Sequence, residues 1–435
     1  MLLYDDMKIA CIGTGFVGVV TSAVLAKLGH QVVGLDIESA KVDSLRQGTV
    51  PFFEPGLSEL LLETQSSGHL TFTTDYQSAI SDADIIMTMV GTPSRSDGQA
   101  DLKYVYAASE SLAPYLKENA IVVVKSTVPP GTNAKVRAII QGKTSVKFHL
   151  ASVPEFLKEG TAVEDTLHPD RAVIGVESDY ASDVLTQLHT PLTTNIIVMR
   201  PESAQMCKYA ANNYLATRIT FINQISDLCE INGADIQEVI QGIGADKRIG
   251  SHYWYPGLGY GGSCFPKDVK EIASYAKAVG ESESLFIKID VLNDARIVKL
   301  MQKYDTLVGG FSGKTVAVLG LSFKKNTNDT RESPALKVIP YLESQGATVH
   351  ATDPKAIKEV TPLLPSSVKY FDDPYAAIAG SHVVILLVEW DVYIKLDLAK
   401  ISSTMQSPKY FLDTRNQYNK QSVVDAGMQY KGIGR

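Results

Sequence analysis

The chain has 435 residues, of which 45% are hydrophobic and 20% charged, and its formal net charge at pH 7 is −7. This length exceeds one ordinary domain of roughly 100–200 residues, and the composition excludes a disordered or fibrous chain. Because there is no basic excess, we expect neither a nucleic-acid binder nor a binder of anionic membranes. The 4 cysteines and 8 histidines show no disulfide framework and no zinc-ligand spacing, so we predict no metal site.

No stretch reaches the roughly 18 apolar residues that a membrane span needs. The short, acidic opening Met1–Asp6 lacks the charged and apolar regions of a secretory signal. We therefore expect a cytoplasmic protein whose cysteines stay reduced, each kept for packing or for chemistry.

Alternating strands and helices are predicted for the first half of the chain. A buried strand is expected at Lys8–Ile12, a helix at Phe16–Leu28 and a second strand at Gln31–Asp36. Further buried-strand runs are Asp84–Val90, Ala120–Lys125 and His149–Val153. Strands separated by helices imply right-handed crossovers, so residues 1–200 are predicted to form a Rossmann domain with a parallel, doubly wound sheet.

A glycine-rich motif, Gly13-Thr-Gly15-Phe-Val-Gly18, lies between the first strand and its helix. Gly13 permits the tight turn, Gly15 lets a pyrophosphate approach the backbone, and Gly18 allows the helix to pack closely on the strand. Asp36 ends the next strand, where a carboxylate binds the adenosine ribose and repels a 2′-phosphate. The pattern predicts NAD rather than NADP; the alternative is a simple turn followed by a surface aspartate.

Polar residues follow two later strands. Thr127 comes after the strand that ends near Lys125, and Glu155 and Glu159 come after the strand that ends near Val153. Ligands of open α/β sheets bind outside the carboxyl ends of the strands, so all three residues are candidates for a site. Taken singly, each is better explained as a residue that caps a loop than as a functional one.

One long helix is predicted at Glu202–Ile231, which contains neither proline nor glycine. At 1.5 Å per residue it would be about 45 Å long, a length typical of helices that connect domains or pack against a partner subunit. Lys208 and Asn212 are four residues apart and share one face, so an amine and an amide are predicted to point into a site. A solvated helix face is the alternative. Residues 201–300 are predicted to form a central helical region that serves dimerisation and catalysis.

The segment Gly259–Asp268 combines a glycine-rich approach, a cysteine, a proline and the start of a helix. The Cys264 thiol, just before a helix N-terminus and close to Lys267, is expected to have a lowered pKa. Asp268 lies one turn further on and is predicted to face the same site. The alternative is a small buried cysteine, a description that fits the other three: Cys11, Cys207 and Cys229.

A third part, residues 311–435, is predicted to be a second Rossmann-like domain. Its expected strands are Lys314–Gly320, Ala347–Asp353 and His382–Val388, with a helix near Pro334–Ser344. The segment after the first of these strands lacks the three-glycine spacing, so no second dinucleotide is expected. It carries instead the cations Lys324, Lys325 and Arg331, which suit a diphosphate; a solvated basic loop is the alternative.

A thiolate beside NAD suggests an oxidation in two stages. An alcohol oxidised to an aldehyde would be captured by Cys264 as a thiohemiacetal, give up a second hydride, and leave a thioester for hydrolysis to an acid. Lys208 and Asn212 would stabilise the oxyanions. Glu155 or Asp268, together with Thr127, would position or deprotonate water.

These motifs together resemble those of the UDP-glucose/GDP-mannose dehydrogenase family, and above all its UDP-glucose-oxidising branch. The resemblance extends over nearly the whole chain and rests on the segments Gly13–Gly18, Lys125–Gly131, Pro154–Gly160, Lys247–Gly250, Gly261–Asp268 and Phe323–Ser333. It implies oxidation of UDP-glucose to UDP-glucuronate with two NAD+. Two alternatives remain open: the same chemistry on GDP-mannose or a UDP-N-acetylhexosamine, and a non-catalytic NAD-binding sensor or scaffold.

The resemblance also implies roles for individual residues. Cys264 would be the nucleophile, assisted by Lys208, Asn212 and Asp268, with Thr127 and Glu155 in the water-handling step. NAD would be bound, beyond the glycine motif, by Asp36, Lys41, Thr92, Thr127, Glu159, Lys267 and Arg331. The UDP-sugar would be bound by Glu155, Lys208, Asn212, Tyr253, Gly261 and Lys324. Arg248 would reach the substrate site of a second subunit, so a homodimer built on the long helix is expected.

Overall fold

The computed structural model describes residues 6–435, so all but the last residue of the Met1–Asp6 opening lies outside the described residues. The chain divides into two compact units, Met1–Ala211 and Asn212–Arg435. Each contains one sheet. Among the described residues no helix combines the length and the apolar character that crossing a bilayer requires.

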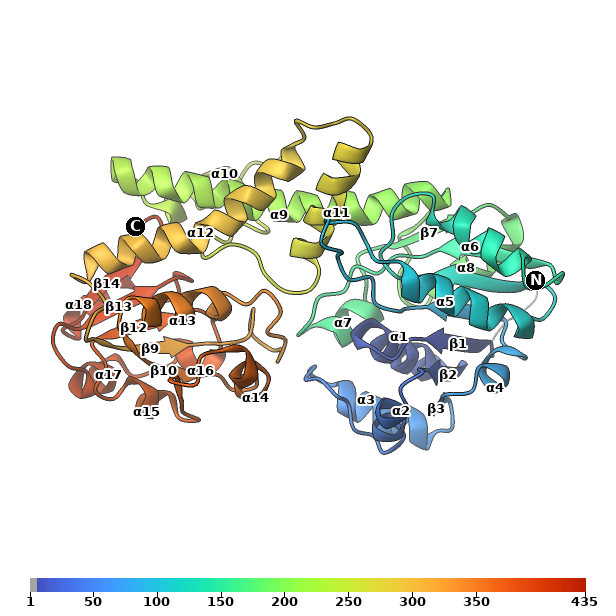
Figure 1. The fold of residues 1–435 in the computed structure, drawn as a ribbon, viewed down its shortest axis with the longest axis horizontal. Helices are drawn as coiled ribbons and strands as arrows, with labels where there is room; N and C mark the ends of the chain where they lie inside the picture. Colours follow the sequence, from blue (N-terminus) through green and yellow to red (C-terminus); the bar gives the residue numbers. More distant parts are fainter. Residues whose placement is uncertain (1–5) are drawn as a thin grey trace. The chain divides into compact units, whose positions relative to one another are not determined.

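The first unit is built on an eight-stranded sheet with the order β3-β2-β1-β4-β5-β6-β7-β8 (Figure 1). Its strands are β1 (Lys8–Ile12), β2 (Gln31–Leu35), β3 (Leu70–Thr73), β4 (Ile85–Thr88), β5 (Ala120–Val124), β6 (Phe148–Ser152), β7 (Ala172–Val176) and β8 (Ile196–Met199). Every strand that the sequence predicted is present, and the order across β3 to β6 is that of a Rossmann fold. Strands β3, β7 and β8 were not predicted.

One pair of strands departs from the predicted parallel sheet. β6 and β7 are antiparallel, whereas all other neighbours in this sheet are parallel. The connection after β6 contains only the short helix α7 (Ala162–Leu167). It does not cross to the other end of the sheet, so β7 starts at the edge where β6 ends. The loop that carries Glu155 and Glu159 therefore stays at the carboxyl ends of the parallel strands.

Helices cover both faces of this sheet. They are α1 (Phe16–Lys27), α2 (Ser39–Arg46), α3 (Leu57–Ser66), α4 (Tyr76–Ile80), α5 (Lys103–Leu112), α6 (Thr132–Gln141), α7 and α8 (Asp179–His189). Ile9 and Cys11 of β1 belong to a core with α1, α3 and α8, whereas Ala10 and Ile12 belong to a core with α5 and α6. Because both strand faces are buried, the strands read as continuous apolar runs.

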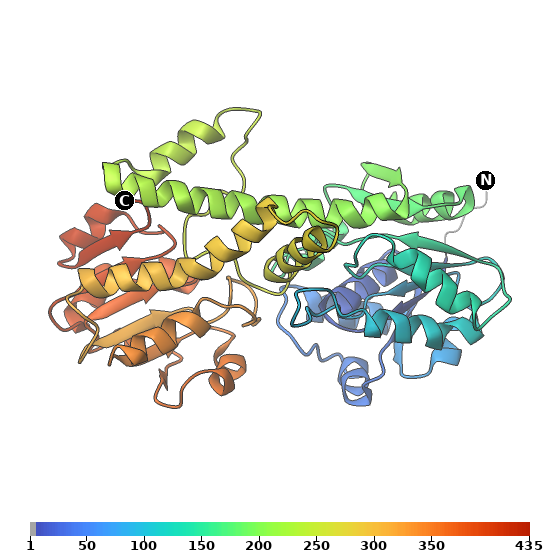
Figure 2. The same ribbon diagram turned by 45° about the horizontal axis from the view of Figure 1, so that its top comes forward.

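A 32-residue helix, α9 (Pro201–Asn232), begins in the first unit and continues into the second (Figure 2). The second unit then contains α10 (Ile236–Gly244), α11 (Phe265–Ala278) and α12 (Leu285–Leu307). The predicted long helix is confirmed within one residue at each end. Its continuity follows from the absence of helix-breaking residues over its whole interior.

The second sheet has six strands, all parallel, in the order β11-β10-β9-β12-β13-β14. The strands are β9 (Thr315–Leu319), β10 (Thr348–Thr352), β11 (Lys369–Tyr370), β12 (Val383–Leu386), β13 (Tyr410–Asp413) and β14 (Gln429–Gly432). Its helices are α13 (Ala335–Ser344), α14 (Ile357–Val360), α15 (Pro374–Ile378), α16 (Asp391–Ile394), α17 (Leu398–Thr404) and α18 (Lys420–Asp425). The prediction of two Rossmann-like domains joined by a long helix is thus confirmed.

Candidate functional site

The glycine motif forms the turn between β1 and α1. Gly13 has a left-handed φ of +95°, and a Cβ atom there would lie 2.8 Å from the Met89 carbonyl oxygen. A Cβ atom on Gly18 would overlap the carbonyl of Gly13. Gly15, which precedes the first residue of α1, has open space where its side chain would be. A pyrophosphate can therefore approach the free N–H groups of the helix N-terminus at Gly15.

Asp36 lies directly after β2, and its carboxylate is held by four donors. One oxygen accepts hydrogen bonds from the Thr14 backbone N–H at 2.9 Å and the Thr14 hydroxyl at 2.8 Å, and contacts Lys41 Nζ at 3.2 Å. The other oxygen accepts from the Glu38 N–H at 3.1 Å. Burial would raise the pKa of Asp36, but the hydrogen bonds from Thr14 and Glu38 and the charge of Lys41 outweigh it and lower the pKa. An ionised carboxylate thus occupies the position at which NAD-dependent enzymes bind the ribose.

The loops after β4 and β5 are joined by short hydrogen bonds. The buried Thr92 hydroxyl donates to the backbone carbonyl of Thr127 at 3.0 Å. The hydroxyl of Ser126 donates to the Val90 carbonyl at 2.7 Å. Thr92 and Thr127, 35 residues apart in the chain, are therefore brought to one edge of the sheet.

The loop after β6 carries a buried ion pair. Glu155 Oε1 lies 3.1 Å from Lys208 Nζ of α9, and their side chains are only 10% and 4% exposed. The second Glu155 oxygen accepts the Leu157 N–H at 2.8 Å. Two cations contact the Phe156 ring: the Arg171 guanidinium lies 3.7 Å from its centroid and Lys208 Nζ lies 5.3 Å from it. Because Lys208 is buried and paired, its part of α9 is not a solvated helix face. Glu159 is half-buried on the same loop.

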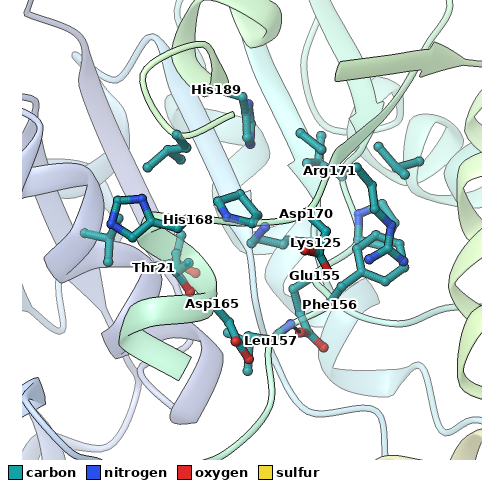
Figure 3. A pocket seen from close by; sticks show the side chains of 18 of the residues that line it. Thr21, Lys125, Glu155, Phe156, Leu157, Asp165, His168, Asp170, Arg171 and His189 are labelled. Carbon is teal, nitrogen blue, oxygen red and sulfur yellow. Dashed lines mark hydrogen bonds between the residues drawn. The ribbon is translucent and has the colours of Figure 1, made fainter. Parts of the chain in front are cut away.

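A cavity of about 190 Å³ lies behind this loop, lined by Glu155, Phe156, Lys125, His189 and other residues (Figure 3). Burial lowers the pKa of Lys125, although the charge of Glu155 acts in the opposite direction. Burial also lowers the pKa of His189 to about 4, so its ring is neutral at pH 7. Lys125 begins one of the sequence motifs, but no role was predicted for it, and nothing in the sequence predicted the cavity.

In the second unit, Cys264 occupies the position just before α11, and Pro266 lies in the first turn of that helix. Its side chain is exposed, with the Ser263 hydroxyl 3.6 Å from the sulfur. Cys11 and Cys229 are buried, and Cys207 is half-buried on α9. Among the four cysteines, Cys264 is therefore the one whose side chain is exposed.

The glycines before Cys264 pack against the loop that follows β9. The Gly262 N–H donates to the Arg331 carbonyl at 3.0 Å. A Cβ atom on Gly262 would lie 2.7 Å from the Phe323 ring, and one on Gly261 would overlap the Glu332 carbonyl. Within the second unit, the loop that carries Cys264 and the loop that follows β9 are thus in direct contact.

Asp268 belongs to a buried cluster of polar side chains. It is 1% exposed, and its two oxygens lie 2.5 Å from Asn212 Nδ2 and 2.5 Å from Lys267 Nζ. Lys267 Nζ also lies 3.4 Å from both oxygens of the buried Glu271. Burial would lower the pKa of Lys267, but the two carboxylates raise it above its ordinary value. Lys267 was predicted to lie close to the Cys264 thiol, and the charge of Cys264 does act on it, but its ion pairs are with Asp268 and Glu271. Glu271 was missed, although its spacing of four from Lys267 was a signal.

The three cations after β9 have different surroundings. Lys325 pairs with Asp391 at 3.3 Å, and Arg331 with Asp329 at 2.7 Å, both at exposed positions. Lys324 Nζ lies 5.5 Å from the centre of the Phe323 ring. Arg415, which sequence analysis missed, donates to the Leu387 carbonyl at 2.7 Å and pairs with Glu389 at 3.2 Å. The half-buried Arg415 follows β13, in a part of the chain that contains none of the sequence motifs.

Asp353 occupies, after β10, the place that Asp36 has after β2. One of its oxygens accepts from the backbone N–H groups of Leu321 and Ser322, the Ser322 hydroxyl and the Trp390 indole, and the other from the N–H groups of Lys355 and Ala356. A carboxylate has about four lone-pair sites. Six protein donors saturate it, so Asp353 is not available to a ribose.

Two further residues predicted for the site, Arg248 and Tyr253, precede the loop that carries Cys264. Arg248 is exposed and pairs with Asp246 at 2.6 Å within its own loop. Tyr253 has a left-handed φ of +63°, which is uncommon outside glycine, and its ring lies 6.4 Å from that of Phe265. The structure thus places Tyr253 beside the start of α11.

The chain is similar to known proteins over nearly its whole length. Models of the UDP-glucose/GDP-mannose dehydrogenase family match the chain in three parts: the NAD binding domain at residues 7–193, the central domain at 202–295 and the UDP binding domain at 317–420. UDP-glucose 6-dehydrogenase TuaD of Bacillus subtilis is 42% identical over 98% of this chain and 93% of its own length. A UDP-glucose dehydrogenase structure from Pyrobaculum islandicum has a TM-score of 0.91 at 37% identity, covering 98% of both chains. A UDP-D-ManNAc dehydrogenase structure from Pyrococcus horikoshii has a TM-score of 0.86 at 26% identity, covering 99% of both chains.

Proposed function

Because the chain belongs to the UDP-glucose/GDP-mannose dehydrogenase family and is an NAD-dependent oxidoreductase, we propose that it oxidises UDP-glucose to UDP-glucuronate. The observation that carries the proposal is the exposed Cys264 before α11, in a chain that also contains an intact dinucleotide turn. A simple alcohol dehydrogenase needs no such thiol. The same chemistry on GDP-mannose or a UDP-N-acetylhexosamine is the second candidate, and the likeness to the Pyrococcus horikoshii UDP-D-ManNAc dehydrogenase favours the latter of these two.

The proposed reaction consumes two NAD+ and one water. NAD, when bound, accepts one hydride in each of two oxidations and becomes NADH. Between them the Cys264 thiolate adds to the aldehyde carbonyl, forming a C–S bond and an alkoxide that takes up a proton. Loss of the second hydride leaves a thioester. Water then adds to this carbonyl, the C–S bond breaks, and the sulfur leaves as thiolate. The sum is R–CH₂OH + 2 NAD+ + H₂O → R–COO⁻ + 2 NADH + 3 H+.

The buried polar groups supply the charges that these steps require. Lys208 is an ammonium that can stabilise the alkoxide and the tetrahedral oxyanions, and its pairing with Glu155 fixes its position. Asn212 lies one helical turn after Lys208 on the same face of α9, and its amide donates to Asp268. Glu155, with Thr127, is proposed to orient the hydrolytic water, because its carboxylate can accept a proton from it.

Separate groups are proposed to bind the two nucleotides. Asp36, Lys41, Thr92 and Glu159 in the first unit would bind NAD together with the glycine turn, as would Lys267 and Arg331 in the second. Lys324, Tyr253 and Gly261 would bind the UDP-sugar. Lys324, on the loop after β9, supports this division, because a cation there supplies positive charge that a diphosphate needs.

The proposal predicts two NADH per UDP-glucose. NADH absorbance would be followed to completion with limiting UDP-glucose, GDP-mannose or UDP-N-acetylhexosamine, and the products separated by anion-exchange chromatography. UDP-glucose is expected to yield two NADH and one uronic acid. One NADH with a released aldehyde would contradict the covalent mechanism. A full yield from another nucleotide sugar alone would replace the proposed substrate.

We also propose a homodimer built on α9 in the central region, residues 201–300. In the second unit, Tyr214, Phe221 and Leu228 recur every seven residues and are 59%, 50% and 55% exposed. A stripe with this spacing lies along one side of a helix and is typical of helix pairing. The exposed Arg248 would then serve the site of the second copy, as the family resemblance implies.

Charges on this stripe are expected to give a monomer. Tyr214→Asp combined with Leu228→Asp would place two carboxylates where apolar surface meets in the dimer, and sedimentation equilibrium would report the mass. Leu62→Asp, on the exposed side of α3, is the matched control and should leave the dimer intact. A monomeric wild-type protein, or a double variant that still dimerises, contradicts the proposal.

A further inference from the structure

Glu54 is a buried carboxylate to which the preceding sections assign no role. It is 5% exposed and lies in the segment between α2 and α3. Its Oε2 accepts the backbone N–H of Gly160 at 2.6 Å, and its Oε1 accepts that of Ala162 at 2.7 Å. These donors are 106 and 108 residues further along the chain. Glu54 thus binds, with both oxygens, the end of the loop that carries Glu155 and Glu159.

The rest of this loop is held by its own side chains. The Leu157 N–H bonds to Glu155, and the Lys158 N–H bonds to Asp165 at 2.9 Å. The Asp165 carboxylate also accepts the Thr161 hydroxyl at 3.0 Å. These contacts shape the loop, and Glu54 adds the two backbone N–H groups on either side of Thr161, where the loop enters α7. Hydrogen bonds from backbone N–H groups to an ionised, buried carboxylate are about twice as strong as neutral ones.

The residues around Glu54 also touch the dinucleotide turn. The Phe52 ring packs 4.9 Å from that of Phe16, which is the first residue of α1 and part of the glycine motif. Phe16, Phe52 and Leu157 pack against the same apolar core. The short segment Phe52–Glu54 therefore connects the turn proposed to bind pyrophosphate with the loop proposed to handle water.

From these contacts we infer that Glu54 is a positioning residue for the oxidation: it fixes the loop that aligns Glu155 with Lys208. The inference rests on the proposed function, which makes Glu155 part of the water-handling step. Glu155 and Lys208 pair in a buried site, where a small shift of the loop separates charges that cannot be solvated. Misplacement of about 1 Å can cost about 100-fold in rate.

Glu54→Gln tests this role with little change in shape. Its amide oxygen can accept only one of the two N–H groups, and its NH₂ group faces the other donor. We expect kcat to fall by about 10- to 100-fold, while the dissociation constants of NAD and UDP change by less than about threefold. Deuterium exchange should accelerate at residues 154–166 and stay unchanged in β1, β4 and β5. Glu54→Asp, which keeps the charge, should recover part of kcat.

Glu63→Gln is the matched control, because Glu63 lies on α3 and pairs with Lys27 at an exposed position. It is expected to have parental kcat. A folded Glu54→Gln protein with parental kcat would overturn the inference, as would loss of NAD binding with faster exchange throughout the first unit, which indicates a merely structural role. If instead the wild-type protein releases no NADH from any nucleotide sugar, the proposed function fails, while exchange at residues 154–166 still tests the contact made by Glu54.

Discussion

Cys264→Ala is expected to abolish acid formation while NAD binding persists. The exposed thiol precedes α11 and is the proposed point of covalent attachment. Without it the aldehyde cannot be held as a thiohemiacetal, so no thioester forms and the second oxidation stops. Loss of a nucleophile typically costs about 10⁴- to 10⁶-fold in kcat. NAD binding should persist because the glycine turn and Asp36 belong to the first unit.

The measurement combines chromatography of uronic acid with fluorescence titration of NAD. Cys207→Ala is the matched control, since Cys207 is half-buried on α9 and has no proposed role in the reaction. It should retain the parental rate. Uronic acid made by Cys264→Ala at the parental rate would rule out the covalent mechanism. It would also favour the alternative that Cys264 has only a structural role in its loop.

Lys208→Met is expected to reduce both stability and activity. Removing one partner of a buried ion pair leaves the other charge unpaired, which typically costs about 3–5 kcal/mol. Glu155 is only 10% exposed and would be that unpaired charge. The oxyanions would lose their ammonium as well, a loss worth about 10²- to 10³-fold in kcat.

The double variant Lys208→Met, Glu155→Leu separates these two effects. Replacing both charges by apolar groups removes the unpaired carboxylate, so the urea midpoint should return toward the parental value. Activity should stay low, because neither the ammonium nor the carboxylate is present. NADH release and urea unfolding followed by fluorescence measure the two properties. If kcat recovers together with stability, Lys208 and Glu155 have no chemical role.

The first sheet shows how much of a fold the hydrophobic pattern of the sequence can predict. The strand runs at Lys8–Ile12 and Ala120–Lys125 were predictable because both of their faces are buried, which makes the pattern continuous and apolar. β8 was not predicted, although it is an apolar run, because it has only four residues and its side chains do not alternate between apolar and polar. The antiparallel direction of β7 was also beyond reach, since it depends on which end of the sheet the preceding loop leaves.

Local sequence by itself determined the turn at Gly13–Gly18, the carboxylate at Asp36, the long helix and the loop around Cys264. In each of these the constraint acts between residues close in the chain: a backbone angle, a helix start, or an unbroken helical run. Tertiary structure alone decided the pairs made across long separations: Glu155 with Lys208, 53 residues apart, and Glu54 with Gly160, 106 apart. A buried carboxylate requires a donor but does not specify which one, and only the packed fold brings the two within hydrogen-bond distance.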